Sequence, residues 1–309
     1  MFERVVTSPR TLPPRGLHSS AGASPFGRAL RRWRTSRRLS QLELATRTGT
    51  PARHVSFLET GRSRPSREMV LRLADALDVP LPDRNALLQV AGFAPAFATR
   101  PLDDAALGPV RFVIERLLAA HAPYPAIVLD RWYDILDANL GGRRVFLGGA
   151  AIDRDDPPSL IDLILGPFKA AVINWDELVW DAVLRLRREV AAAGDDARLG
   201  DILERAEAVA KTLPPRQDVA GAAGDAPVLM TRVRFDAASR QMASGGGGPP
   251  RAEPARPATE APALTELRTL STLVHFGGAR DITVDGLHLE LVYPADPATD
   301  AVLRQLGAP

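Results

Sequence analysis

The chain has 309 residues, of which 45% are hydrophobic and 25% are charged, and it contains no cysteine. This length predicts about two domains, and the lack of cysteine excludes disulfides, thiolate metal sites and cysteine nucleophiles. We find no apolar run near the roughly 18 residues that a membrane-spanning helix needs, and no apolar N-terminal segment of a secretory signal, so we expect a cytoplasmic protein that does not bind membranes.

The charge is unevenly distributed along the chain. The net charge is only +2, but residues 23–80 contain twelve arginines and five acidic residues, so this segment alone carries +7. Residues 1–22 carry +2, which leaves −7 for residues 81–309. A positive surface attracts the phosphate backbone of nucleic acids. We therefore expect the N-terminal part, and not the rest, to bind nucleic acid.

Residues 1–22 contain prolines, glycines and serines without hydrophobic periodicity. Such a segment cannot bury enough apolar surface to order itself, so we expect a disordered N-terminal tail. From Pro25 onward, apolar residues recur at helical spacing. This pattern predicts a first helix that ends around Arg37.

Residues 41–61 show the pattern of two short helices joined by a tight turn. Gly49 can take the left-handed conformation that such a turn requires, and Gly61 ends the second helix. The apolar faces are formed by Leu42, Leu44 and Ala45 in the first helix and by Val55 and Leu58 in the second. Two helices joined in this way cross steeply, and the second can enter a DNA groove. The segment predicts a DNA-binding helix-turn-helix.

Two further helices are predicted after a basic loop at residues 62–65. Apolar residues at helical spacing mark residues 66–77, and another helix runs from Pro82 to Ala91, with Val90 among its apolar residues. With the three helices before the loop, these make a compact, all-α, five-helix unit.

Residues 26–93 resemble the XRE family of bacterial regulators, whose DNA-binding unit is a five-helix, lambda-repressor-like domain. The resemblance rests on Leu-Ser-Gln-x-x-Leu-Ala at 39–45, Gly49, Val-Ser-Phe-Leu-Glu-Thr-Gly-Arg at 55–62 and Leu-Arg-Leu-Ala-Asp-Ala-Leu at 71–77. Motifs at 83–88, 91–95, 101–104 and 125–131 are similar to the MmyB-like branch, in which a PAS-like domain thought to bind a small ligand follows the helix-turn-helix. The resemblance implies an α+β, PAS-like C-terminal domain with an antiparallel sheet and flanking helices.

The second helix of the pair, about residues 51–60, is the predicted recognition helix. The side chains that lie away from its apolar stripe and are free to enter the major groove are Ala52, Arg53, His54, Ser56 and Phe57. Arg53 is our candidate for reading a base, because a guanidinium can bind O6 and N7 of guanine with two hydrogen bonds; a phosphate contact is the alternative. Phe57 is expected either to pack on a thymine methyl group or to hold the helices together.

Contacts to the DNA backbone are expected on both sides of this helix. Gln41 lies at the first turn of the preceding helix, where related proteins direct an amide and the helix N-terminus at a phosphate. The arginines expected to bind phosphates nearby, unless they are solvated surface charges, are Arg38, Arg62 and Arg64. Many related proteins have a capping serine where this chain has Pro51. We expect Thr50 to cap the helix instead, with Pro51 at the first helical position.

Residues 95–108, rich in proline, alanine and aspartate, are predicted to be a linker. A helix over residues 110–121 follows, which could connect the two domains or pair with its copy in a dimer. Residues 126–130 and 132–137 predict two short strands, and Asn139 then begins a short helix. This order of elements resembles the opening of a PAS-like domain.

Helices and strands continue to the C-terminus. The remaining helices are predicted at residues 160–165, 174–190, 199–209 and 296–306, and the remaining strands at 227–235, 267–276 and 282–293. Asn174, with Glu177 three residues on, is the cap signal of the longest helix. Residues 237–262, with four consecutive glycines and many prolines, predict a flexible insertion.

The last predicted strand has an alternating pattern. Leu287, Leu289 and Leu291 alternate with His288 and Glu290, which is typical of a half-buried strand. The pair Asp285-Gly286 predicts either a second tight turn or a bend. The expected domains are thus a tail at 1–22, a helix-turn-helix domain at 23–94, a linker at 95–108 and a PAS-like ligand-binding and dimerisation domain at 109–309.

The C-terminal domain shows no pattern of a catalytic or metal site. Its histidines, His121, His275 and His288, are not at metal-ligand spacing, and we find no nucleophile elbow and no phosphate-binding glycine loop before a helix. The four glycines at 245–248 lead into two prolines and so cannot start a phosphate-binding helix. We expect no enzyme activity, no metal and no cofactor.

A ligand pocket is expected between the sheet and the helices, as the resemblance implies. The side chains that would line it are Trp132, Asn139, Phe146, Trp175, Phe235 and His275. Asn139 or His275 would orient a carboxylate or amide of the ligand, whereas core packing is the alternative for all six residues. MmyB-like regulators suggest an apolar, fatty-acid-like ligand.

The sequence therefore predicts a sequence-specific transcription regulator that binds a near-palindromic, double-stranded DNA operator as a homodimer and represses rather than activates. One alternative is a DNA-binding protein whose C-terminal domain only dimerises or recruits a protein partner, which predicts no cavity of roughly 300 Å³ or more. The other is an enzyme tethered to DNA, which predicts clustered polar side chains with perturbed proton affinities in a cleft.

Overall fold

The computed structural model describes residues 23–194, 196–215, 229–235 and 265–308. The chain divides into two compact units, one with residues up to 79 and 86–94, and the other with residues 80–85 and those from 95 onward. The predicted tail at 1–22 and the predicted insertion at 237–262 lie outside the described residues.

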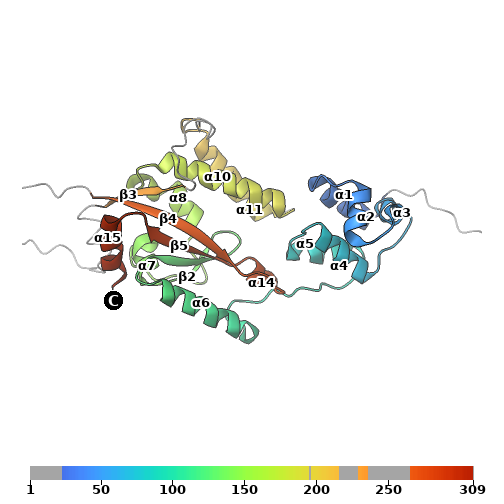
Figure 1. The fold of residues 1–309 in the computed structure, drawn as a ribbon, viewed down its shortest axis with the longest axis horizontal. Helices are drawn as coiled ribbons and strands as arrows, with labels where there is room; N and C mark the ends of the chain where they lie inside the picture. Colours follow the sequence, from blue (N-terminus) through green and yellow to red (C-terminus); the bar gives the residue numbers. More distant parts are fainter. Residues whose placement is uncertain (1–22, 195, 216–228, 236–264, 309) are drawn as a thin grey trace, which may run out of the picture. The chain divides into compact units, whose positions relative to one another are not determined.

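The first unit is all helical (Figure 1). Its helices are α1 (Pro25–Ser36), α2 (Gln41–Thr48), α3 (Ala52–Glu59), α4 (Arg67–Ala76) and the C-terminal half, from residue 86, of α5 (Leu81–Val90). Their buried apolar side chains form a single core cluster, to which α5 contributes Leu87 and Leu88. The predicted five-helix, lambda-repressor-like domain is confirmed.

Local sequence signals account for where these helices begin. The hydroxyls of Ser24, Ser40 and Ser66 accept hydrogen bonds from backbone N–H groups in the first turns of α1, α2 and α4. In α2, Glu43 completes a capping box with Ser40. Gly49 ends α2 with a φ of 63°, the left-handed conformation that the tight turn needs.

Three local predictions for this unit are wrong. The N-cap residue of α3 is Pro51 and not Thr50. Pro51 has an extended backbone, and no side chain forms a capping hydrogen bond at this helix start. The Thr50 hydroxyl lies 3.9 Å from the Met69 sulfur instead. Leu42 and Val90, predicted on apolar faces, are 67% and 44% exposed. Helical spacing alone does not show how much of a helix its neighbours cover.

The second unit is built on a five-stranded antiparallel sheet with the strand order β2-β1-β5-β4-β3. The strands are β1 (Ala126–Leu129), β2 (Ile135–Ala138), β3 (Thr231–Phe235), β4 (Thr265–His275) and β5 (His288–Pro294). Helices flank this sheet, so the predicted α+β, PAS-like class is confirmed.

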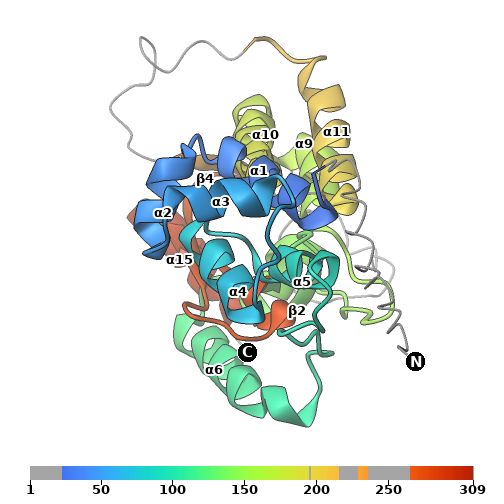
Figure 2. The ribbon, with the colours of Figure 1, turned by 90° about the vertical axis from the view of Figure 1, so that its right-hand side faces the viewer.

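Helices cover both faces of the sheet (Figures 1 and 2). The helical elements are η1 (Ala105–Leu107), α6 (Gly108–His121), α7 (Leu140–Leu147), α8 (Leu160–Leu165), α9 (Phe168–Ala171), α10 (Trp175–Ala192), α11 (Ala197–Ala210), α14 (Ile282–Asp285) and α15 (Pro297–Gly307). The α6 residue Ile114 packs in one cluster with Val128 of β1, whereas Val183 of α10 packs in another with Ile127 and Leu129. Successive β1 side chains therefore point to opposite, covered faces.

The coverage of both faces corrects the prediction for β5. Leu287 and Leu289 are buried on the α6 face, as expected, but His288 and Glu290 are buried too, on the α10 face. The alternating pattern indicated a solvated polar face. Instead, polar side chains are enclosed in the interior, where each needs a hydrogen-bond partner.

Residues 282–285, predicted as part of that strand, form the short helix α14. Asp281 accepts a hydrogen bond from the backbone N–H of Thr283 and caps the helix, and Gly286 ends it. The Asp285-Gly286 pair is therefore the end of a helix, and it is neither the second tight turn nor the bend that was predicted. The predicted linker pairs with this segment: the Ile282 N–H donates to the Ala98 carbonyl at 2.8 Å.

Asn174 begins α10, as predicted, but its side chain does not cap the helix. The amide instead donates to the carbonyl of Met230 and accepts from the N–H of Arg232 at the start of β3. Asn174 thus joins α10 to the sheet edge, a long-range role that the local cap signal did not reveal.

Candidate DNA-binding surface and ligand pocket

The outward side of α3 is available for contact with another molecule. Val55 and Leu58 are fully buried, whereas Arg53 is exposed and Ala52, His54, Ser56 and Phe57 are half-buried. Arg53, His54, Ser56 and Phe57, four of the five side chains predicted to enter a groove, therefore lie on the helix surface that the core leaves open, whereas Ala52 packs against the core.

Phe57 brings two of the predicted arginines together. The guanidinium groups of Arg53 and Arg62 lie 4.9 Å and 5.8 Å from the centroid of its ring. A cation over an aromatic face is held electrostatically, so the ring restricts where both charges point. Arg38 and Arg64 are exposed near the ends of α1 and α3, and Thr50 is half-buried between α2 and α3.

A buried ion pair supports the start of α2. Glu59 is 4% exposed and accepts hydrogen bonds from Arg34 Nε at 2.6 Å and from Arg34 Nη2 at 3.1 Å. The Gln41 side-chain amide donates to the same carboxylate at 2.8 Å. Gln41, predicted to contact phosphate, is therefore held in one orientation, with a second amide hydrogen left to donate.

Arg34 and Glu59 were not among the predicted site residues. A signal was present, because Glu59 follows Val55 by four residues and Leu58 by one, which places it on the buried side of α3. The sequence alone did not show which arginine would balance the charge, since Arg34 is 25 residues away along the chain.

The second unit contains an apolar pocket of about 210 Å³ between the sheet and its helices. Side chains from α7, α8, α9, α15 and strands β3, β4 and β5 line it, among them Phe146, Ile164, Phe168, Val233, Val292 and Leu303. Glu290 of β5 is its buried acidic residue. The pocket lies in the layer between sheet and helices where the resemblance places a ligand.

Among the predicted ligand residues, Phe146 lines this pocket. The Trp175 indole N–H donates to the Ile164 carbonyl at 2.6 Å within the core, and the Trp132 indole N–H donates to Asp196. His275 is exposed toward the end of β4. Nothing is described for the side chain of Phe235, which lies outside the described side chains.

Asn139 has a structural role at the start of α7. Its oxygen accepts from the N–H groups of Ala126 and Gly142, and its amide donates to the carbonyls of Leu118 and Tyr124. All four bonds stay within the protein, so a satisfied buried amide, the alternative considered for this residue, fits the geometry.

Polar side chains gather next to the pocket, between α10 and the sheet. The Tyr133 hydroxyl donates to Glu189 at 2.6 Å, and the Tyr133 ring centroid lies 5.3 Å from that of His288 and 5.6 Å from the Arg185 guanidinium. Burial raises the pKa of Glu189, and burial is also the main reason that the pKa of His288 falls to about 4. His288 is therefore neutral at pH 7.

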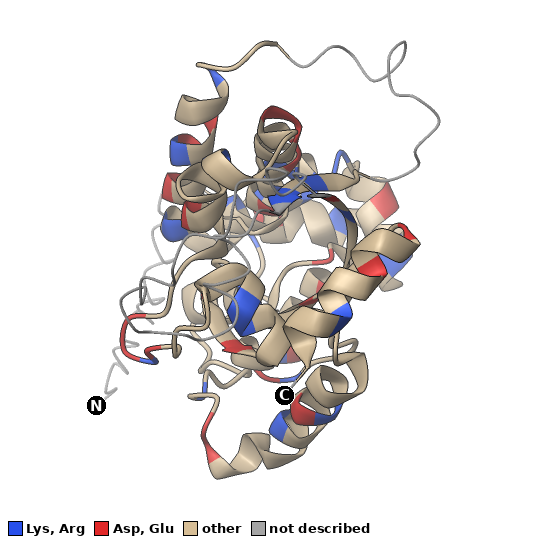
Figure 3. Ribbon diagram, turned by 90° about the vertical axis from the view of Figure 1, so that its left-hand side faces the viewer, with Lys and Arg blue, Asp and Glu red and all other residues tan. Residues whose placement is uncertain are grey.

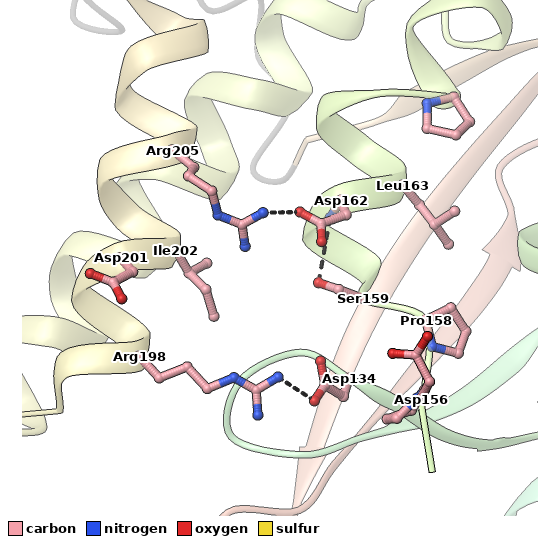
Figure 4. Close-up of a pocket in the computed structure, with 12 residues that line it drawn as sticks. Asp134, Asp156, Pro158, Ser159, Asp162, Leu163, Arg198, Asp201, Ile202 and Arg205 are labelled. Carbon is pink, nitrogen blue, oxygen red and sulfur yellow. Dashed lines mark hydrogen bonds and ion pairs between the residues drawn. The ribbon is translucent and has the colours of Figure 1, made fainter. Parts of the chain in front are cut away.

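A wider, polar cleft of about 850 Å³ lies along α8 and α11 (Figure 4). Two ion pairs cross it, from Arg198 to Asp134 and from Arg205 to Asp162. Basic and acidic residues are mixed along the helices of this unit in the same way (Figure 3). These ion pairs tie α11 to α8 and to the loop before β2.

Two family comparisons match the chain. Residues 25–87 match a helix-turn-helix domain, and residues 110–306 match the MmyB-like transcription regulator ligand binding domain. A comparison with curated proteins finds no match.

Among the described residues, we find no helix with both the length and the apolar character to cross a bilayer.

Proposed function

Because the chain belongs to the family of MmyB-like transcription regulators, we propose that it recognises one operator sequence through α3 and alters its DNA affinity when a small ligand occupies the pocket. The proposed operator recognition rests on the open surface of α3, where Arg53 is exposed and shares the Phe57 ring with Arg62. This surface belongs to a segment with a net charge of +7, which suits the phosphate backbone.

We assign each residue of the DNA-binding surface a role from its place on α3 or beside it. Arg53 reads a guanine from the recognition helix, while Arg38, Arg62, Arg64 and the amide of Gln41 bind phosphates around it. Arg34 and Glu59 act through Gln41 and do not touch DNA themselves. The chain binds as a homodimer, with half-sites about one helical turn apart, and represses.

The ligand acts by shifting the relative placement of the two recognition helices of the dimer. It must bind one arrangement better than the other, because equal affinity for both would change nothing. At about 30 Å³ for each water-sized group, the 210 Å³ pocket holds a molecule of about seven non-hydrogen atoms. We propose that the domain of residues 109–309 binds a ligand of that size with an apolar body.

A second candidate function is that the C-terminal domain only dimerises or recruits a protein partner. The size of the pocket favours it, because 210 Å³ is below the roughly 300 Å³ of ordinary ligand sites. Exposed apolar side chains at Phe112 and Val113 of α6 are consistent with such a contact.

One experiment separates these functions. Purified full-length protein is examined by native mass spectrometry, and its operator is selected from random duplexes in the same preparation. A bound small molecule, together with an enriched near-palindromic sequence, supports the ligand-sensing regulator. An enriched sequence without any bound molecule supports the second function, and the absence of enrichment contradicts both.

A further inference from the structure

Phe57 differs from the other apolar side chains of α3. Val55 and Leu58 are fully buried, and Ala52 packs against the core of the five-helix unit. Phe57 is half-buried, and among the side chains that the structure describes it takes no part in that core. The expectation that its ring holds the helices together therefore has no support in the packing. An aromatic ring outside a core is instead typical of a surface that binds another molecule.

Two guanidinium groups lie over the Phe57 ring, that of Arg53 at 4.9 Å and that of Arg62 at 5.8 Å from its centroid. The backbone supports this arrangement, because the Phe57 carbonyl accepts hydrogen bonds from the N–H groups of Arg62 at 2.8 Å and of Ser63 at 3.1 Å. Within the described part of the chain, neither guanidinium forms an ion pair or donates a hydrogen bond. The N–H groups of both guanidiniums are therefore available to another molecule.

The chemistry of these three side chains matches that of neighbouring nucleotides. A guanidinium that lies over a ring uses its face, so the N–H donors at its edge remain free for a guanine or a phosphate. Two like charges beside one ring repel each other, and an anion such as a phosphate relieves that repulsion. The ring itself offers apolar surface. Because thymine is the unmodified base that presents a methyl group in the major groove, the ring suits a thymine.

The distance between Arg53 and the ring limits which bases they can reach together. Arg53 and Phe57 are separated by about one turn of α3, so they lie on the same side of the helix. Successive base pairs are stacked about 3.4 Å apart. The 4.9 Å between the guanidinium and the ring centroid is longer than one such step and shorter than two. A guanine bound by Arg53 and a methyl group packed on Phe57 therefore belong to neighbouring base pairs.

We infer that Phe57 determines specificity by packing on the C5 methyl group of a thymine in the base pair next to the guanine that Arg53 reads. Each operator half-site then contains a G·C pair beside an A·T pair at this position. Arg62, which lies against the same ring, binds a backbone phosphate of that step. The inference rests on the proposed operator recognition through α3 and goes beyond it, because it names two neighbouring bases of the operator.

The test removes only the methyl group from the DNA. In the operator selected from random duplexes, each thymine of one half-site is replaced in turn by uracil, which keeps the hydrogen-bonding groups of thymine and lacks its methyl. Fluorescence anisotropy with the full-length protein should show one thymine at which uracil weakens binding about three- to fivefold, which corresponds to about 0.8 kcal/mol for one buried carbon group. That thymine should lie in the base pair next to the guanine for which Arg53→Ala loses its preference.

Phe57→Ala should bind the thymine and uracil operators with equal affinity, because the ring that contacts the methyl group is absent. A ring with only a structural role would weaken binding to both duplexes alike and leave the thymine preference unchanged, which would overturn the inference. The matched control is Phe112→Ala, which removes an exposed phenylalanine of α6 whose ring centroid also lies 5.1 Å from a guanidinium, that of Arg116. This control should keep the thymine preference. The uracil series in the unmodified protein needs no variant to fold.

Three outcomes separate this inference from the proposed operator recognition. If a sequence is enriched but uracil is bound as tightly as thymine at every position, the thymine contact is overturned and operator recognition stands. If a thymine responds to uracil through Phe57 but lies beside no guanine that depends on Arg53, the reading of neighbouring base pairs by these two side chains is overturned. If no sequence is enriched, operator recognition fails and the thymine contact fails with it.

Discussion

Arg53 and Arg62 lie over the same aromatic ring but belong to different parts of the backbone. Arg53 is in the first turn of α3, whereas Arg62 is in the loop after it. The N-terminal residues of a recognition helix reach base edges, and flanking loops meet the DNA backbone. The two side chains should therefore contribute differently to specificity.

Arg53→Ala is expected to reduce the preference for the operator over random duplex by about 1–3 kcal/mol, because a bidentate guanine contact is lost. Arg62→Ala should weaken both duplexes alike and lower the salt dependence of binding by about one unit. Fluorescence anisotropy against both duplexes over a salt series measures each effect. Equal losses on both duplexes for Arg53→Ala would mean that this arginine contacts phosphate.

His288 should make the second unit sensitive to acid. Its pKa in the folded protein is about 4, lowered from 6.5 chiefly by burial, with His275 and Arg185 adding to the effect. Between these values the unfolded chain binds a proton that the folded chain does not. Stability is therefore full above pH 6.5 and falls, by on the order of 3 kcal/mol, as the pH drops toward 4.

Urea unfolding of the full-length protein between pH 4 and 7 measures this loss. His288→Gln should flatten the dependence in that range, while His275→Gln, the same substitution at the exposed neighbour, should leave most of it. An unchanged acid profile for His288→Gln would assign the sensitivity to other groups.

At the scale of elements, the linker is attached to α14. Besides the backbone bond from Ile282 to Ala98, Arg100 forms an ion pair with Asp281 at 2.6 Å, and the Thr283 hydroxyl donates to the Arg100 carbonyl. Asp281 is buried and also caps α14. One carboxylate thus fixes both a helix start and a segment about 180 residues earlier in the chain.

Asp281→Ala should remove the cap and leave Arg100 unpaired. We expect a loss of stability of about 1–3 kcal/mol, since a helix cap alone contributes about 1 kcal/mol. Faster amide hydrogen exchange should follow in peptides covering residues 98–100 and 282–285. The control is Glu68→Ala, which breaks the exposed pair with Arg72 and should cost less than about 0.5 kcal/mol. Unchanged exchange at 98–100 would show that the linker is held by other contacts.

At the scale of the whole molecule, the proposed dimer sets the spacing of its operator. Two symmetry-related recognition helices reach the same side of a duplex when their half-sites lie about 10 base pairs apart. Moving one half-site by about five base pairs turns it to the opposite side. We expect the affinity for the shifted operator to fall toward the affinity for a single half-site. A mobility-shift assay measures both affinities and also shows whether two chains bind each operator. Equal affinity for both spacings contradicts the dimer.

The helix-turn-helix unit was predictable because its signals are local. The left-handed Gly49 and the apolar spacing of the helices act within a few residues of one another, and they led to the correct helices. The misplaced cap at Thr50 and the exposed Leu42 are small errors of the same local reasoning. The exposed side chains of α3 followed from the same periodicity, whereas the partner of Glu59 did not.

The ligand pocket was not predictable in the same way. Phe146 lines the pocket, whereas Trp132, Asn139 and Trp175 are held by hydrogen bonds within the protein, and Glu290 was predicted to lie on a solvated face. Whether a polar residue of a strand meets water depends on what covers the sheet. Here the covering helix, α10, precedes β5 by about 100 residues.

By itself, the sequence determined that this chain has an arginine-rich five-helix DNA-binding domain, because periodicity, turn glycines and charge act over short distances along the chain, and its resemblance to a known family implied the α+β domain that follows. Only the tertiary structure decided that both faces of β5 are covered, that the acidic side chain of Glu290 lines an apolar pocket, and that this carboxylate lies within electrostatic range of the buried Arg185. The reason is physical: burial and hydrogen-bond satisfaction depend on contacts between segments distant in the chain, and no local pattern specifies them.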